Sequence, residues 1–132
     1  MPDPAVNANK DLVRHWLARL LWGPPPLAIL VSGLIDLGPV MRGAIWSLAF
    51  VWAGAACIAN ACRSGRLHCY ITGPFFLLLA TASLLHGLGI LSLGPYGWRW
   101  IGGAFAVGSP LLTIVPERVW GRYSDGRTER CC

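Results

Sequence analysis

Long apolar segments, separated by short polar ones, occupy most of the chain from Leu27 to Val115. Four of them have the character of membrane-spanning helices, and we place these at residues 26–40, 43–61, 74–93 and 98–115. The first is short for a hydrocarbon core of ~30 Å, which requires roughly 20 apolar residues. The pattern predicts an all-α integral membrane bundle of four transmembrane helices with a short N-terminal interfacial helix.

That interfacial helix is expected at Asp11–Trp22, DLVRHWLARLLW, where apolar and arginine side chains fall on different sides of a helical period. Three consecutive prolines, Pro24 to Pro26, end it because proline has no backbone N–H to donate. We divide the chain into an N-terminal tail with the interfacial helix (1–25), a transmembrane domain (26–115) and a polar tail (116–132).

The composition agrees with a membrane protein. Hydrophobic residues make up 55% of the chain and charged residues 13%, against roughly 25% charged residues in soluble domains. The net charge of +5 does not indicate nucleic-acid binding, because the basic residues lie in short clusters between apolar segments, as topology signals do. The N-terminus lacks the pattern of a cleaved secretory signal, so we expect the first span to direct insertion into the lipid bilayer.

The distribution of Lys and Arg predicts the orientation. If all four spans cross, two basic residues lie on one side, Arg42 and Arg99, and nine on the other. By the positive-inside rule, the side with nine is cytoplasmic, and both termini lie there. A three-span arrangement without the first segment would split the cluster of nine, so four spans are favoured. The nine residues are Lys10, Arg14, Arg19, Arg63, Arg66, Arg118, Arg122, Arg127 and Arg130.

The segment CRSGRLHCY, residues 62–70, falls in the predicted cytoplasmic loop and holds Cys62, His68 and Cys69. Soft metal ions accept thiolate and imidazole ligands, and Gly65 would let the loop fold Cys69 and His68 back toward Cys62. Cys57 and Cys62 lie about 140° apart on a helix, so they do not share one face. The spacing matches no standard zinc pattern. The other interpretation is that these cysteines only pack, because a reducing cytoplasm disfavours disulfides.

A second thiol pair, Cys131 and Cys132, ends the chain. Adjacent cysteines on a polar tail suit the capture and transfer of a thiophilic ion such as Hg(II). Two alternatives remain open: an end without function, and a lipid anchor on a C-terminal Cys-Cys.

Two ionisable residues fall within predicted spans, Asp36 in the first and His86 in the middle of the third. Such residues are costly in lipid and often mark a proton or ion path. Alternatively, Asp36 lies near the outer interface and pairs with Arg42, and His86 forms a structural hydrogen bond.

The remaining polar residues around the loop are interpreted as positioning it. Thr72 is expected to cap the third helix and Pro74 to occupy its first turn, with Gly73 allowing a sharp turn. Small residues in GLGILSLG and GAFAVGSP indicate close helix packing. The loop-positioning residues are Asn60, Gly65, Arg66, Thr72, Gly73 and Pro74.

Two resemblances follow from these motifs. The run CIANACRSGRLHCYITGPFF, Cys57 to Phe76, resembles a segment of small, mostly uncharacterised bacterial inner-membrane proteins, with matches at Asn60, Gly65, Arg66, His68, Cys69, Tyr70 and Thr72 to Pro74. The ending PERVWGRY is similar to theirs. In its architecture and its Cys131–Cys132 pair, the chain is similar to the small mercuric ion transporters of mercury-resistance operons. Those carry a cysteine pair in the first span, which this chain lacks.

The sequence therefore predicts a non-enzymatic, multi-pass protein of the bacterial inner membrane that binds and moves a thiophilic metal ion, most simply the mercuric ion. Cys57 and Cys62 would line the path, Cys69 with His68 would receive the ion, and Cys131 and Cys132 would pass it to a cytosolic thiol acceptor. No resident cofactor is expected. The alternative is a small subunit or scaffold in a homo-oligomer or larger membrane complex. An enzyme using Cys69 and His68 as nucleophile and base is disfavoured, because adjacent residues rarely meet with suitable geometry.

Overall fold

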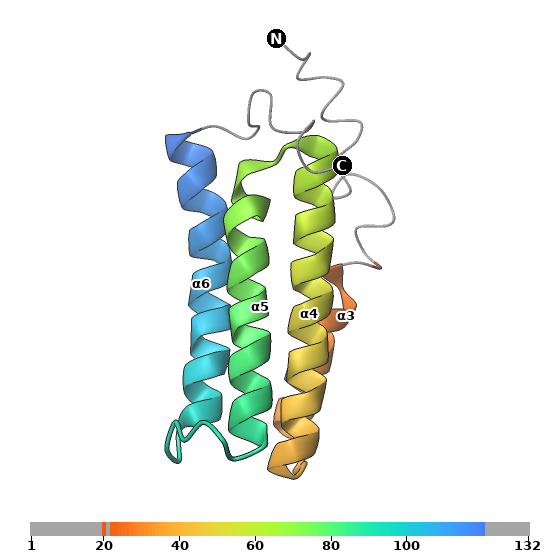
Figure 1. Ribbon diagram of the computed structural model, residues 1–132, viewed down its shortest axis with the longest axis vertical. Helices are drawn as coiled ribbons and strands as arrows, with labels where there is room; N and C mark the ends of the chain where they lie inside the picture. The colour runs from red at the N-terminus through yellow and green to blue at the C-terminus, as the bar shows by residue number, and fades with distance from the viewer. Residues whose placement is uncertain (1–19, 21, 121–132) are drawn as a thin grey trace.

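The structure, a computed structural model, describes Leu20 and residues 22–120, which form a bundle of helices (Figure 1). The predicted all-α fold is confirmed for these residues. Most of the predicted interfacial helix at 11–22 lies outside them, as do Cys131 and Cys132. The helices are α3 (Pro24–Leu34), α4 (Pro39–Ser64), α5 (Leu67–Gly87) and α6 (Gly97–Val119).

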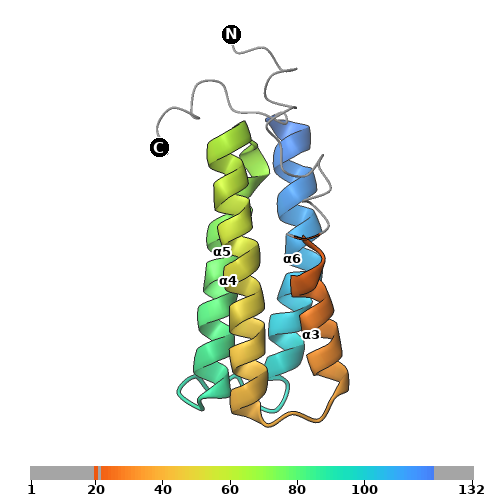
Figure 2. The ribbon, with the colours of Figure 1, turned by 90° about the vertical axis from the view of Figure 1, so that its right-hand side faces the viewer.

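Three long helices run side by side with alternating direction, and α3 covers part of one side (Figures 1 and 2). α4 packs along α5, α5 along α6, and α3 against α4. Because α3 has 11 residues and α4 has 26, α3 lies beside only one part of α4. The end of the bundle where α4 connects to α5 is therefore formed by α4, α5 and α6.

The connection between α4 and α5 is much shorter than expected. It consists of Gly65 and Arg66, and Gly65 ends α4 with a left-handed φ of 67° while its N–H donates to the carbonyl of Ala61 at 2.8 Å. A single left-handed glycine can reverse the chain at a helix end. The prediction that residues 62–73 form a loop is therefore wrong, and Cys62, His68 and Cys69 lie in helices.

Thr72, Gly73 and Pro74 also differ from the prediction, because they lie inside α5 rather than before it. The Thr72 hydroxyl donates to the carbonyl of His68 at 2.7 Å, within the helix, so it does not cap the helix start. Proline inside a helix removes one backbone hydrogen bond, and its ring crowds the carbonyl four residues earlier. Here the packing of residues 67–73 against α4 and α6 outweighs that loss.

The other helix ends shift as well. α5 ends at Gly87, so His86 lies at a helix end rather than in mid-span, and its Nδ1 lies 2.9 Å from the carbonyl oxygen of Leu91. Asp36 is exposed in the α3–α4 connection, and Arg42 donates to the carbonyl of Ile35 at 3.1 Å. At the other end of the bundle, α6 continues to Val119. The residues after 115 that were predicted to begin the tail are therefore helical as far as Val119.

Glycine pairs bring α4 and α5 into close contact. A Cβ atom added to Gly43 would lie 2.9 Å from Cα of Gly87, and one added to Gly73 would lie 2.8 Å from Cγ1 of Ile58. Gly54 faces the carbonyl of Gly73 in the same contact. Small residues permit such close helix packing, and here they place the ends of α4 and α5 against each other.

Much of the outer surface of the bundle is apolar. Leu34 is 88% exposed, and Leu48 and Leu78 are each 71% exposed. Among the described helices, α4 and α5 could each cross a membrane by length and composition. The expectation of four spans is not confirmed, since α3 is a shorter apolar helix and α6 does not meet the same criterion.

Candidate thiol site

Two buried cysteines from neighbouring helices lie together at the α4–α5 end of the bundle. Cys57 of α4 is 1% exposed and Cys69 of α5 is fully buried. The two thiols are close enough to influence each other's charge. All three described cysteines are free thiols, the third being Cys62. The fold therefore builds a dithiol from residues that are 12 positions apart in sequence.

His68 and Asn60 surround the sulfur of Cys69. His68 Nε2 lies 3.3 Å from Cys69 Sγ, and the Asn60 amide donates to the same sulfur at 3.6 Å. Asn60 is fully buried, and Ser64 donates to its backbone carbonyl at 2.8 Å. Adjacent residues rarely meet with suitable geometry, but at the start of α5 the side chains of His68 and Cys69 are in contact.

Glu117 of α6 completes the cluster from the third helix. Its Oε1 lies 2.7 Å from His68 Nδ1 and accepts from Arg66 Nε at 2.9 Å. Glu117 is thus an ionic link between the end of α6 and the start of α5. We did not single it out from the sequence, although no other acidic residue occurs between Asp36 and Asp125. Its separation from all other acidic residues was the available signal.

The arrangement gives the cluster a defined chemistry. When His68 Nδ1–H donates to the Glu117 carboxylate, Nε2 presents its lone pair to the Cys69 thiol. Cys69 can then transfer its proton to His68 when its sulfur forms a new bond. The resulting imidazolium is stabilised by Glu117, and Arg66 holds the carboxylate in place. The dithiol therefore has a built-in proton acceptor.

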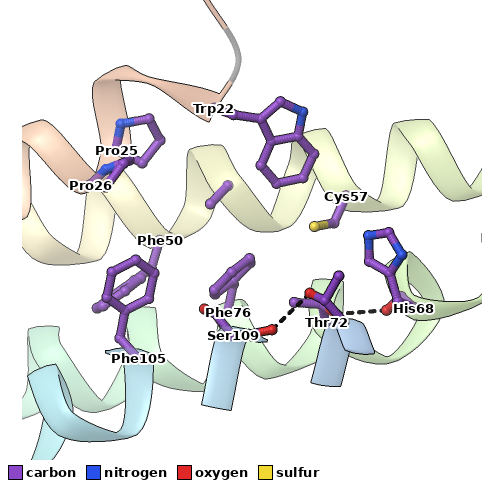
Figure 3. Close-up of a pocket in the computed structure, with 12 residues that line it drawn as sticks. Trp22, Pro25, Pro26, Phe50, Cys57, His68, Thr72, Phe76, Phe105 and Ser109 are labelled. Carbon is purple, nitrogen blue, oxygen red and sulfur yellow. Dashed lines mark hydrogen bonds between the residues drawn. The ribbon is translucent and has the colours of Figure 1, made fainter. Parts of the chain in front are cut away.

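A pocket of about 210 Å³ reaches this cluster from inside the bundle (Figure 3). The Cys57 sulfur is turned toward the space between Trp22 and Thr72, whereas Cys69 does not line the pocket. Cys57 is therefore the thiol that a molecule in the pocket would meet. The lining residues, contributed by all four described helices together with Trp22, are Trp22, Pro25, Pro26, Phe50, Ala53, Cys57, His68, Thr72, Phe76, Phe105, Ser109 and Thr113.

Other predicted site residues are not brought into this cluster. Cys62 is half-buried on α4, about 140° around the helix from Cys57. Asp36 and His86 lie toward the opposite end of the bundle, so a relay through them does not reach the dithiol. Within the described residues, no group of three or more His, Cys, Asp or Glu side chains is arranged to hold a metal ion.

Fold and site together define an all-helical protein with two helices apolar enough to span a membrane and a buried dithiol at one end. Comparison of the chain with protein families, curated proteins and solved structures found no match. The two resemblances inferred from the sequence therefore stay predictions.

Proposed function

We propose that this protein binds a thiophilic metal ion between Cys57 and Cys69 and moves it at the bacterial inner membrane. The observation that carries the proposal is that these two buried thiols, each from a different helix, lie close together. A buried dithiol without a disulfide is a small, soft ligand set. Thiolates select soft ions over hard ones such as Mg²⁺ or Ca²⁺.

A two-coordinate ion fits this ligand set best. Hg(II), Ag(I) and Cu(I) can be held by two sulfurs, so they need no third side chain of the kind that tetrahedral Zn²⁺ requires. The mercuric ion remains our leading candidate for the cargo.

The surrounding residues support ion exchange. Metal ligands must be deprotonated, so ion binding releases protons, and His68 next to Cys69 can receive one. Glu117 and Arg66 fix the orientation of His68, as residues outside the ligand set commonly do at metal sites. Loading and release then consist of proton exchange with His68 and thiol exchange at the sulfurs.

Transport also requires a membrane and a route out of the site. The exposed apolar side chains of the bundle suit a lipid bilayer. With both termini in the cytoplasm, the dithiol lies at the cytoplasmic end, the side on which Cys131 and Cys132 would accept the ion. From there it would pass to a cytosolic thiol. This part of the proposal extends the sequence prediction.

Retention of Hg(II) against excess glutathione tests the proposal on the purified chain, in a Cys131→Ser/Cys132→Ser background. We expect Cys57→Ser and Cys69→Ser each to lose most of the retained ion, whereas the matched control Cys62→Ser on α4 keeps it. In cells, uptake of radioactive Hg(II) should fall in Cys57→Ser and in Cys69→Ser, and it should be unchanged in Cys62→Ser. Equal retention by all variants would contradict the proposal.

A second candidate function is a thiol enzyme, and one observation favours it. Cys69, His68 and Glu117 have the contacts of a nucleophile, its base and an orienting carboxylate. His68 Nε2 lies 3.3 Å from Cys69 Sγ, and His68 Nδ1 lies 2.7 Å from Glu117 Oε1. Against it, Cys69 is fully buried and does not line the pocket. Metal binding, in which the ion enters by way of Cys57, accounts for both thiols.

A further inference from the structure

The pocket beside the dithiol is larger and more apolar than a bare ion requires. Its walls include the rings of Trp22, Phe50, Phe76 and Phe105, and its volume is about 210 Å³. A cavity of about 150 Å³ with apolar walls is enough to bind benzene in another protein. The space beside Cys57 can therefore hold one aromatic ring.

The direction of the Cys57 sulfur links the pocket to the dithiol. The sulfur is turned into the space between Trp22 and Thr72, and the aromatic rings lie beyond it toward α3 (Figure 3). A linear bond from sulfur through a metal to carbon would extend from Cys57 into this apolar part of the pocket. A bare ion held between Cys57 and Cys69 would leave the same space unused.

We propose that the site takes an organometallic cation, R–M⁺, in which the metal is soft and two-coordinate and R is an apolar group of about the size of a phenyl ring. Cys57 would bind the metal, and R would occupy the pocket among the aromatic side chains. This inference rests on the proposed thiol site and specifies its substrate class.

The chemical step is ligand exchange and needs no oxidant. The Cys57 S–H bond and the bond from the metal to its leaving ligand X break, and an S–M bond forms. The products are Cys57–S–M–R, a proton and X⁻, while the metal–carbon bond is retained. Cys69, close to Cys57, and His68 beside it can accept the metal in a later exchange.

Phenylmercury and methylmercury are the probes that test this inference. Each is titrated against glutathione on the purified chain, in a background of Cys62→Ser, Cys131→Ser and Cys132→Ser. Because each probe forms the same kind of mercury–sulfur bond with glutathione as with the protein, the competition cancels the difference in bond strength between the two probes. Because the phenyl ring is removed from water in the pocket, we expect phenylmercury to be preferred by at least ~10-fold.

Two variants on α6 show whether the preference comes from the pocket. Ser109→Leu fills the pocket and should reduce the preference to below about 3-fold. Ala104→Leu adds the same side chain at an exposed position of α6 and should keep the preference. These expectations follow from the apolar area that the ring buries.

The outcomes separate this inference from the proposed function. Equal affinity for phenylmercury and methylmercury in the otherwise unaltered pocket would overturn the inference, even with strong Hg(II) retention and whether or not Ser109→Leu folds. A preference that persists in a folded Ser109→Leu protein would overturn it too. A different result would contradict the proposed role of the two-thiol ion site. In it, none of the protein variants retains Hg(II), while the preference for phenylmercury remains.

Discussion

At the scale of single residues, the site depends on how side chains from three helices surround Cys69 and the neighbouring His68. Cys69 lies close to Cys57, His68 and Asn60, and Glu117 reaches the far nitrogen of His68. The thiols were identified from the sequence as candidate ligands, and so was His68. Glu117 was not, because its role arises from a contact across 49 positions of sequence that no local pattern encodes.

Glu117→Gln should weaken Hg(II) retention by roughly 10-fold, because changes to the groups that orient metal-site residues typically cost 10–100-fold in affinity. The variant keeps the size of the side chain but removes the charge that faces His68 and Arg66. Arg118→Gln, at the exposed neighbouring position, is the control and should retain the ion as the unmodified chain does. Competition with glutathione measures both.

The same experiment has an internal check. Since Glu117 acts through His68, the His68→Gln/Glu117→Gln double variant should be no weaker than His68→Gln alone. Independent, additive losses would show that Glu117 does not work by orienting this histidine.

At the scale of elements, the sequence predicted helices in the right places but not their ends. Apolar periodicity locates the interior of a helix, whereas the turn at Gly65 depends on a single left-handed residue. We assigned residues 62–73 to a loop because they are polar. In the structure their polar groups are satisfied inside the bundle, by Thr72 bonding to His68 and by Glu117 bonding to Arg66. Such tertiary contacts cannot be inferred from residue polarity alone.

The contact between α4 and α5 predicts the effect of adding one methyl group. In Gly87→Ala the new Cβ would lie 2.8 Å from Cα of Gly43 and from the carbonyl oxygen of Pro39, so the helices must separate. We expect a loss of about 1–3 kcal/mol in the free energy of unfolding, as in other overpacked cores. Thermal unfolding in detergent measures it as a lower Tm.

Gly33→Ala is the matched control for that change. Gly33 also lies in a helix, α3, but a Cβ there would meet nothing within 4 Å. The variant should be neutral or up to about 1 kcal/mol more stable, because alanine favours helix more than glycine does. A Gly87→Ala protein as stable as Gly33→Ala would contradict the close packing of α4 and α5.

At the scale of the whole molecule, the described basic residues separate toward the two ends of the bundle. Arg42 and Arg99 lie at the starts of α4 and α6, and Arg63, Arg66 and Arg118 lie at the other end, near the dithiol. The described members of the two groups of basic residues counted from the sequence therefore lie at opposite ends of the bundle, although the helices begin and end at other residues than predicted. The proposed orientation places the dithiol end in the cytoplasm.

Labelling with a membrane-impermeant maleimide tests this orientation in a cysteine-free background. Asp36→Cys is exposed in the α3–α4 connection and Arg63→Cys is exposed near the end of α4. In intact spheroplasts we expect Asp36→Cys to react, whereas Arg63→Cys should react only after the membrane is broken. The reverse pattern, or equal labelling of both in intact spheroplasts, would contradict the orientation.

The central claim is that Cys57 and Cys69 together hold one soft metal ion. X-ray absorption spectroscopy of the Hg(II)-loaded protein tests it most directly, with Cys62, Cys131 and Cys132 replaced by serine. We predict two sulfur ligands for each bound ion, falling to one in Cys57→Ser and in Cys69→Ser. A single sulfur ligand in the protein that keeps both cysteines, or two in either serine variant, would contradict the claim.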